Sequence, residues 1–217
     1  ITQWLEDEAR LVDGAPGLWR AEGGRALGTG LGGDASDVSL APGETAEVGG
    51  RILKGHERDG VIALRVLDPG IDSRATLSGI ERFADAPGQW VVSGRFVPSP
   101  DGATRTVQSV DGTSRSASLD GTVEIELPGG ERANLVVSAD DDGFSLVFAD
   151  GIARDGGHRF RFLDIDPAVD GVMTIDFSGA YLPPCSFSDH YLCPMPAASN
   201  RLETAITAGE RRVLRAP

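Results

Sequence analysis

The residues with the most distinctive chemistry in this chain are its two cysteines, Cys185 and Cys193, which are separated by seven residues. This spacing matches neither a zinc ribbon nor a Cys-x-x-Cys redox pair, and no second ligand cluster completes a tetrahedral site. A disulfide across the loop is geometrically allowed, but a cytosolic chain normally keeps its thiols reduced. We therefore expect both thiols to pack the loop as small buried hydrophobes, with no metal and no cofactor.

An alternative role for these thiols is nucleophilic catalysis, because His190 lies between them in the sequence. If the loop folds Cys185 or Cys193 against the imidazole, His190 is the base that activates the thiol. In this enzymatic hypothesis, Tyr181 and Tyr191 donate protons or line the pocket. Neighbours in sequence need not contact each other in the fold, so the other interpretation is a solvent-facing loop histidine.

A second group of candidate residues suits the binding of anions. Arginine guanidinium groups bind carboxylates and phosphates through two parallel hydrogen bonds. The candidate ligand-binding residues are Arg154, His158, Arg161, Asn200 and Arg201. Around one pocket they would bind a small carboxylate or phosphate ligand. Ion pairs with acidic neighbours such as Asp164, Asp166 and Asp176 explain the same arginines equally well.

The elements that must position these side chains are mostly short strands. The 29 glycines and 13 prolines punctuate segments in which apolar and polar residues alternate. The clearest hairpin runs from Val123 to Val137 and turns at Pro128–Gly130, and Asp140–Gly143 forms the next turn. Many short strands with few helices predict a mainly β fold built as a sandwich or barrel.

Helical spacing is found only near the N-terminus, where the pattern predicts a short helix over Thr2 to Val12, capped by Thr2. We divide the chain into a helical segment at 1–14, a β-sandwich-like module at 15–85 and a β domain at 86–217. The last of these carries the Pro- and Cys-rich C-terminal loop. The expected boundary between the two β parts is Asp85–Gly88.

The charge balance excludes several partners. The chain has 20 Lys and Arg against 33 Asp and Glu, a net charge of -13, so nucleic acids and anionic membrane surfaces are repelled. No apolar run approaches the ~20 residues needed to cross a bilayer. The first residues lack the basic start and apolar centre of a secretory signal. We expect a soluble, cytoplasmic protein, whose oligomeric state the sequence does not indicate.

The C-terminal region carries a long composite pattern. It runs over Ile175–Pro196 as IDFSGAYLPPCSFSDHYLCPMP and continues with NRL at Asn200–Leu202 and AGE at Ala208–Glu210. This pattern resembles the signature of the bacterial and archaeal family catalogued as domain of unknown function 1684. RFVP at Arg95–Pro98 and GHRFRFLD at Gly157–Asp164 resemble further segments of that family, so the resemblance covers most of the chain. It implies no activity, because the family has no assigned function.

A second resemblance concerns the segment from Leu27 to Leu40, which is similar to the opening of forkhead-associated domains. These are β-sandwiches that in their standard form bind phosphothreonine through an arginine beside the first glycine and a Ser-x-x-His sequence. Here Thr29 replaces the arginine, and no Ser-x-x-His follows. The resemblance therefore implies a sandwich scaffold without phosphothreonine binding.

Two functional hypotheses follow from these residues. The first is a non-catalytic β protein, a forkhead-associated-like sandwich joined to a second, barrel-like antiparallel unit, that binds a small ligand, such as an anion, or a protein partner. The second is an enzyme whose pocket lies under residues 181–201 and uses the Cys, His, Tyr and Arg side chains named above. The enzyme requires those side chains to converge on one concave site.

Overall fold

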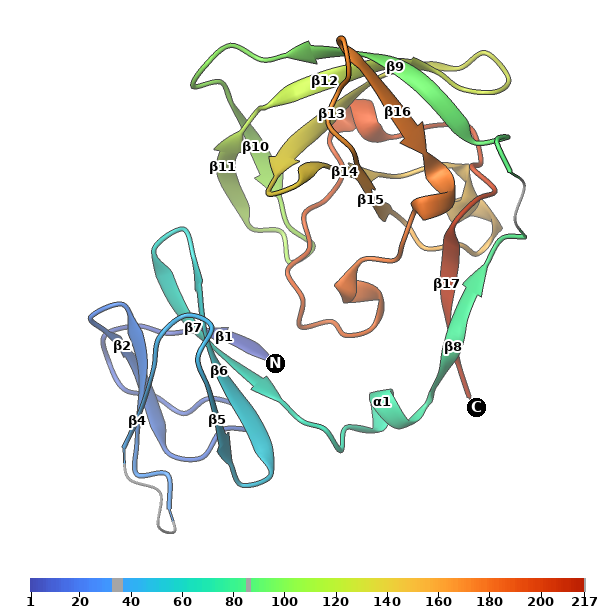
Figure 1. The fold of residues 1–217 in the computed structure, drawn as a ribbon. Helices are drawn as coiled ribbons and strands as arrows, with labels where there is room; N and C mark the ends of the chain where they lie inside the picture. The colour runs from blue at the N-terminus through green and yellow to red at the C-terminus, as the bar shows by residue number, and fades with distance from the viewer. Residues whose placement is uncertain (33–36, 85–86, 217) are drawn as a thin grey trace. The chain divides into compact units, whose positions relative to one another are not determined.

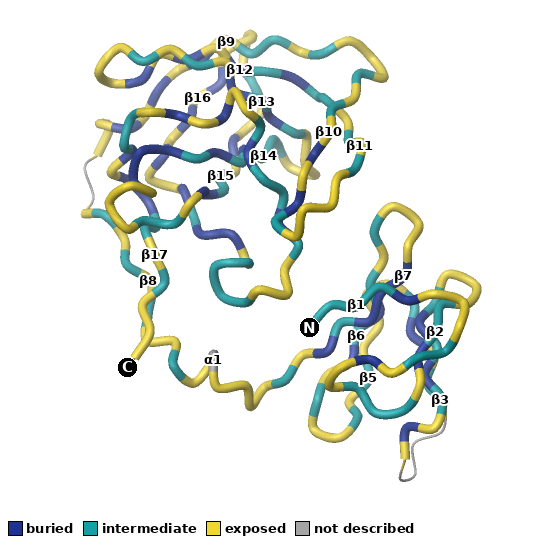
Figure 2. Tube along the Cα trace, turned by 180° about the vertical axis from the view of Figure 1, so that it is seen from behind, coloured by how far each residue is buried: buried dark blue, intermediate teal, exposed yellow. Residues whose placement is uncertain are grey.

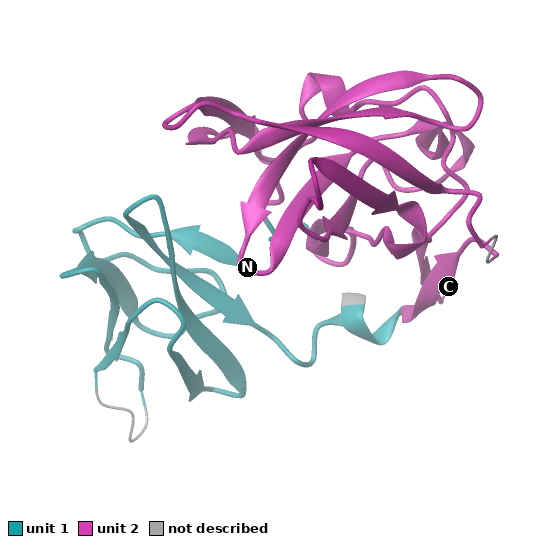
Figure 3. Cartoon of the chain, turned by 45° about the horizontal axis from the view of Figure 1, so that its top comes forward, with its two compact units in different colours: residues 1–76, 189–191 teal, residues 77–188, 192–217 magenta. Residues whose placement is uncertain are grey.

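The computed structural model describes residues 1–32, 37–84 and 87–216, without the side chain of Ser73. The chain forms two compact units, drawn in different colours in Figure 3. Unit 1 comprises Ile1–Thr76 and Asp189–Tyr191, and unit 2 comprises Leu77–Ser188 and Leu192–Pro217. Residues 33–36 of the forkhead-associated-like segment and residues 85–86 of the expected boundary lie outside the described residues.

Unit 1 consists of two antiparallel sheets (Figure 1). The first has the strand order β1 (Thr2–Trp4), β7 (Val61–Leu67), β6 (Arg51–Arg58) and β5 (Thr45–Val48). The second has the order β2 (Leu18–Glu22), β3 (Arg25–Thr29) and β4 (Val38–Leu40). The short helix α1 (Asp72–Ala75) follows β7. Side chains alternate between the two faces of each strand, so Leu53 of β6 and Leu64 of β7 are fully buried in the core.

Trp19 of β2 fills the centre of unit 1, and Gly28 of β3 makes room for it. Trp19 is fully buried, and its indole Nε1 donates to the carbonyl of Pro16 at 2.8 Å. Gly28 pairs with Trp19 across the two strands, and a Cβ at this glycine would lie 2.6 Å from the indole ring. Glycine is therefore required here by the close approach of the ring, while the backbone conformation is ordinary.

The expected N-terminal helix is wrong. Thr2–Trp4 forms strand β1, which pairs with β7, and the backbone N–H of Leu5 donates to the carbonyl of Ile62 at 2.8 Å. Leu5 and Val12, two of the residues at helical spacing, reach the core of unit 1 from non-helical backbone. Pairing with a neighbouring strand satisfies the backbone groups of this segment, so tertiary contacts override its local helical pattern.

Unit 2 is built on a curved antiparallel sheet of six strands (Figure 1). Its order is β15 (Arg161–Ile165), β14 (Gly143–Phe148), β13 (Arg132–Asp140), β12 (Gly121–Glu126), β9 (Val91–Pro98) and β16 (Val172–Asp176). Two further strand pairs are β10 (Thr104–Gln108) with β11 (Ser114–Ser118), and β8 (Leu77–Arg82) with β17 (Glu210–Arg215). Short 3-10 helices are found at Gly151–Asp155, Phe177–Gly179, Pro184–Ser186 and Ala198–Asn200.

The mainly β class and the predicted hairpin are confirmed. Val123 of β12 and Leu135 of β13 pair across the hairpin and are fully buried, as their alternation requires. The turn at Asp140–Gly143 joins β13 to β14. Figure 2 shows the buried residues of unit 2 along the strands of the curved sheet. Within residues 1–32, 37–84 and 87–216, no helix has the length and apolar character that crossing a membrane requires.

We predict that Gly28→Ala destabilises unit 1 by about 1–3 kcal/mol, because the added methyl group overlaps the Trp19 ring. Chemical denaturation followed by the NMR signals of unit 1 measures this loss. Gly70→Ala is the matched control, since its Cβ would approach only the Asp68 side chain, at 3.5 Å. Equal denaturation midpoints for the two variants would contradict the packing of Trp19 on Gly28.

Candidate functional site

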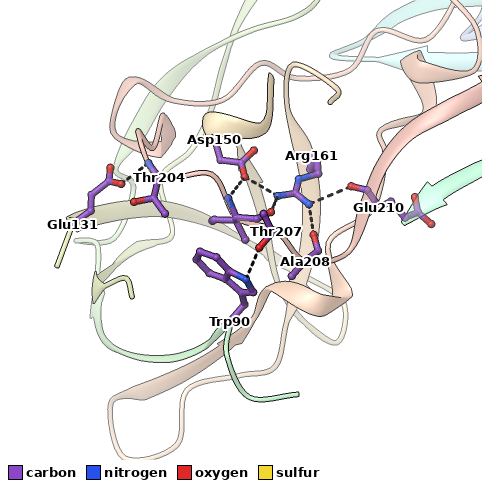
Figure 4. A network of polar contacts seen from close by, with 9 residues as sticks. Trp90, Glu131, Asp150, Arg161, Thr204, Thr207, Ala208 and Glu210 are labelled. Carbon is purple, nitrogen blue, oxygen red and sulfur yellow. Dashed lines mark hydrogen bonds and ion pairs between the residues drawn. The ribbon is translucent and has the colours of Figure 1, made fainter. Parts of the chain in front are cut away.

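Arg161, the first residue of β15, lies at the centre of a buried hydrogen-bond network (Figure 4). Its Nη2 donates to Asp150 Oδ2 at 2.8 Å and to the carbonyl of Ile206 at 2.9 Å. Its Nη1 donates to the carbonyls of Ala208 and Glu210. The exposed fractions of the Arg161 and Asp150 side chains are 0% and 1%. One guanidinium group therefore attaches the C-terminal tail, residues 198–216, to the sheet.

The carboxylate of Asp150 completes this network. Its Oδ2 also accepts a hydrogen bond from the backbone N–H of Ile206 at 2.9 Å. Burial raises the pKa of Asp150 and lowers the pKa of Arg161, and in each group the opposite charge of the partner acts against the shift. Because an unpaired charge at this depth is strongly destabilising, each partner requires the other.

Asn200 forms a second attachment of the tail to the sheet. Its Oδ1 accepts from the N–H of Val136 at 2.8 Å, and its Nδ2 donates to the carbonyls of Val136 at 2.8 Å and Val147 at 2.9 Å. The residue is 2% exposed. The Asn200 amide thus forms with the backbone of β13 and β14 the hydrogen bonds that a neighbouring strand would form. Its NH₂ group and its oxygen are both satisfied by backbone groups.

Glu210 and Gly209 connect the tail to the start of the Pro- and Cys-rich loop, residues 182–197. Glu210 Oε2 accepts from the N–H of Leu182 at 2.8 Å, and Oε1 pairs with Arg82 at 3.1 Å. Gly209 has a φ of +72°, and a Cβ there would lie 2.4 Å from the carbonyl oxygen of Ala180. Only glycine fits this position, since it combines a left-handed backbone with a close contact.

The other three anion-binding candidates are not part of this network. Arg154 is exposed and forms an ion pair with Glu203, which raises the pKa of the arginine. His158 stacks edge-on against Phe160 at 5.4 Å, and burial followed by the charge of Arg159 lowers its pKa. Arg201 is exposed, and its backbone forms a bridge with Ala149. Of the five predicted residues, Arg161 and Asn200 are thus buried, His158 is half-buried, and Arg154 and Arg201 are exposed.

Tyr181 lies beside an acidic hollow of about 420 Å³. Its hydroxyl donates to Asp164 Oδ1 at 3.1 Å, and its backbone pairs with Phe162. Burial and the neighbouring Asp164 raise the pKa of Tyr181 to about 12. The rest of the hollow is lined by Asp140, Asp141, Asp142, Gly143, Phe144, Ile165 and Asp166. In the described part of the chain, His, Cys, Asp and Glu side chains form no group of three or more that could hold a metal ion.

Cys185 and Cys193 lie next to each other across the loop and are not joined by a disulfide. The backbone N–H of Cys185 donates to Cys193 Sγ at 3.3 Å. A hydrogen bond from the Cys185 thiol lowers the pKa of Cys193 to about 7, and the charge of Arg159 acts in the same direction. The same thiol hydrogen bond, followed by burial, raises the pKa of Cys185. In this pair, the Cys185 thiol is therefore the hydrogen-bond donor, and Cys193 is the sulfur on which the thiolate is favoured.

His190 and Tyr191, the remaining residues of the enzymatic hypothesis, belong to unit 1. The backbone carbonyl of His190 accepts from Thr2 Oγ1 at 3.2 Å, and the Tyr191 ring lies 5.8 Å from the guanidinium carbon of Arg65. Burial, followed by the charge of the chain's first amino group, lowers the pKa of His190. The structure thus places the thiols in one unit and the proposed base in the other.

The sequence-based interpretation missed a cluster of basic side chains in unit 1. Lys54, His56 and Arg58 alternate along β6 and therefore share one face of the sheet. Arg65 of β7 lies directly opposite Lys54 on that face. The period-2 spacing of three basic residues within a strand was the available signal.

The fold and these contacts define unit 2 as a curved antiparallel β domain whose sheet is hydrogen-bonded to its own C-terminal tail. The chain belongs to the family described as "Protein of unknown function (DUF1684)", which matches residues 75–211. The match includes the residues on which the resemblance to this family rests. The basic cluster of unit 1 lies outside it.

One solved structure similar to this chain is the solution NMR structure of an uncharacterised protein from gene locus rrnAC0354 of Haloarcula marismortui. The two proteins are 29% identical, and the similarity covers 62% of this chain and 76% of the other, with a TM-score of 0.49. None of the curated proteins matches this chain.

We predict that Asp150→Asn destabilises unit 2 by about 3–5 kcal/mol, because it leaves the Arg161 charge buried without its partner. Denaturant titration of the full chain measures the loss. Arg154→Gln is the control, since it breaks an ion pair at the surface and should leave stability almost unchanged. If both variants unfold at the wild-type midpoint, the buried ion pair does not support the domain.

Proposed function

We propose that the functional centre of unit 2 is the pair Cys185 and Cys193, and that the two thiols convert reversibly to a disulfide by exchange. The contact between the Cys185 N–H and Cys193 Sγ, at 3.3 Å, is the observation that carries this proposal. The N–Cα bond measures about 1.46 Å, so Cys185 Cα lies within about 4.8 Å of that sulfur. The two cysteines are thus neighbours, as an intramolecular disulfide requires.

The acid–base character of the pair favours exchange. Exchange requires a thiolate, and the attacking thiol works best when its pKa is close to the ambient pH. The Cys185 thiol and N–H both donate toward Cys193, so the negative charge is stabilised on that sulfur. Cys185 keeps its proton and is the second thiol to react.

The attachments of the loop support the same function. The start of the loop is held by the bond from Leu182 N–H to Glu210, and the chain just beyond its end is held by Asn200. Fixing both sides reduces the conformational freedom that would otherwise be lost when the two sulfurs join. The fold thus raises the effective concentration of one thiol at the other.

The exchange is balanced in two steps with a small-molecule disulfide as the oxidant. The protein thiolate attacks one sulfur of that disulfide, forms a mixed disulfide and releases one small thiolate, which takes up a proton. The remaining protein thiol loses its proton and attacks the protein sulfur of the mixed disulfide, which releases the second small thiol. Two protein thiols are oxidised, and one small disulfide is reduced to two thiols.

This proposal includes the cytoplasmic location expected from the sequence. Disulfides in that compartment are usually transient, and they serve catalysis or redox sensing. Unit 1 enters the proposal as a forkhead-associated-like scaffold. Anion binding at Arg161 has less support, because both of its terminal nitrogens already donate to Asp150 and to backbone carbonyls.

We predict that the full chain, equilibrated with reduced and oxidised glutathione at stepped ratios, converts between a dithiol and an intramolecular disulfide. Mass spectrometry after acid quenching should show the loss of two hydrogens, with no linked dimer. Cys185→Ser and Cys193→Ser should instead retain glutathione as a mixed disulfide. Thiols that stay reduced at every ratio until the chain is unfolded in denaturant would overturn the proposal.

We also predict that ultraviolet thiolate absorbance of the native protein rises through pH of about 7, which is the pKa of Cys193. Cys185→Ala removes the thiol donor that lowers this pKa, so the rise should move to higher pH. This readout does not require a reagent to reach the buried sulfur. A titration near the ordinary cysteine range, unchanged by the substitution, would show that the two thiols do not interact.

A further inference from the structure

Four basic side chains share one face of the first sheet of unit 1. On β6, Lys54, His56 and Arg58 occupy alternate positions, and on β7 Arg65 pairs directly with Lys54. All four residues are half-buried. Lys54 is the only lysine of a chain whose net charge is -13. The cluster is thus a local concentration of positive charge on a predominantly acidic protein.

The arrangement is electrostatically unfavourable for the protein alone. Like charges directly opposite each other on antiparallel strands destabilise the pair. None of the ion pairs in the part of the chain that the structure describes involves Lys54 or Arg65. Instead, Arg65 Nη2 lies 3.1 Å from His56 Nε2. The Tyr191 ring also lies 5.8 Å from the guanidinium carbon of Arg65. Two like charges placed opposite each other without an acidic partner depart from local rules, and such departures are typical of functional positions.

Aromatic contacts fix part of this face. Trp4 of β1 lies 6.0 Å from the His56 ring, and the guanidinium carbon of Arg58 lies 5.0 Å from the Trp4 ring. Arg58 also lies 3.9 Å from Asp59. Burial, followed by the charges of Arg65 and Arg58, lowers the pKa of His56. The sheet and Trp4 therefore hold His56 and Arg58 in place beside Arg65.

We propose that Lys54, His56 and Arg65 bind a multivalent oxyanion carried by a small molecule. Directly opposite residues on paired strands have Cβ atoms about 5 Å apart, so one phosphate-sized group can contact Lys54 and Arg65 together. His56 borders the same position, since its Nε2 lies 3.1 Å from Arg65 Nη2. The net charge of the chain opposes nucleic acids and anionic membranes at long range, which favours a small ligand.

The test uses the full chain and three probes, namely inorganic pyrophosphate, inorganic phosphate and citrate, at constant ionic strength. The ring signals of the three histidines are followed by NMR. We expect saturable shifts of the His56 signals, while those of His158, in unit 2, stay in place. Pyrophosphate binding more tightly than citrate identifies a phosphate-bearing ligand, and the reverse order identifies a polycarboxylate. Shifts that are absent, or that are equal for His56 and His158, would overturn the proposal.

A second experiment measures pyrophosphate binding by the double variant Lys54→Gln/Arg65→Gln. We expect it to weaken pyrophosphate binding about 100-fold, or about tenfold for each cation removed. Arg20→Gln/Arg25→Gln is the matched control, because it removes the same charge elsewhere in unit 1 and should leave the affinity unchanged. Equal affinity in the two double variants would show that binding depends on net charge alone and would overturn the site.

Discussion

A guanidinium buried without its carboxylate would strongly destabilise unit 2, and the structure supplies Arg161 with partners. The ion pair with Asp150 neutralises the charge, and the carbonyls of the tail satisfy the remaining terminal nitrogens. Because the tail is bound through its backbone, its side chains remain available for other contacts. The Glu210 side chain accepts a hydrogen bond from the Leu182 N–H, so the same tail fixes the start of the Pro- and Cys-rich loop. Burial of one charge thus determines the position of two chain segments.

The sequence predicted the features that local patterns control. The alternation in Val123–Val137 and the turn at Asp140–Gly143 identified strands, because period-2 burial and turn residues act over short distances. The N-terminal helix was predicted wrongly, since β1 obtains its hydrogen bonds from β7, some 60 residues away. The role of Arg161 was ambiguous for the same reason. Its acceptors lie 11 to 49 residues away in sequence, and no spacing rule indicates them.

Our account assigns different chemistry to the two units. In unit 2, Cys185 and Cys193 form a sulfur pair whose thiolate is stabilised by donors from the same loop. In unit 1, the sheet places Lys54 and Arg65 opposite each other without acidic partners among the described residues. The first arrangement favours electron exchange, and the second favours a bound anion. Each rests on contacts within its own unit, so either can fail without the other.

Native-state hydrogen exchange tests most directly whether the buried network fixes the tail and the loop. The decisive amides are those of Ile206, Leu182 and Cys185, whose N–H groups donate to Asp150, Glu210 and Cys193. Our account predicts that the Ile206 and Leu182 amides exchange as slowly as those in the centre of β13, and that the Cys185 amide is also protected. Exchange of all three at the rate of an unstructured chain would show that the tail is not bound to the sheet and would contradict the account.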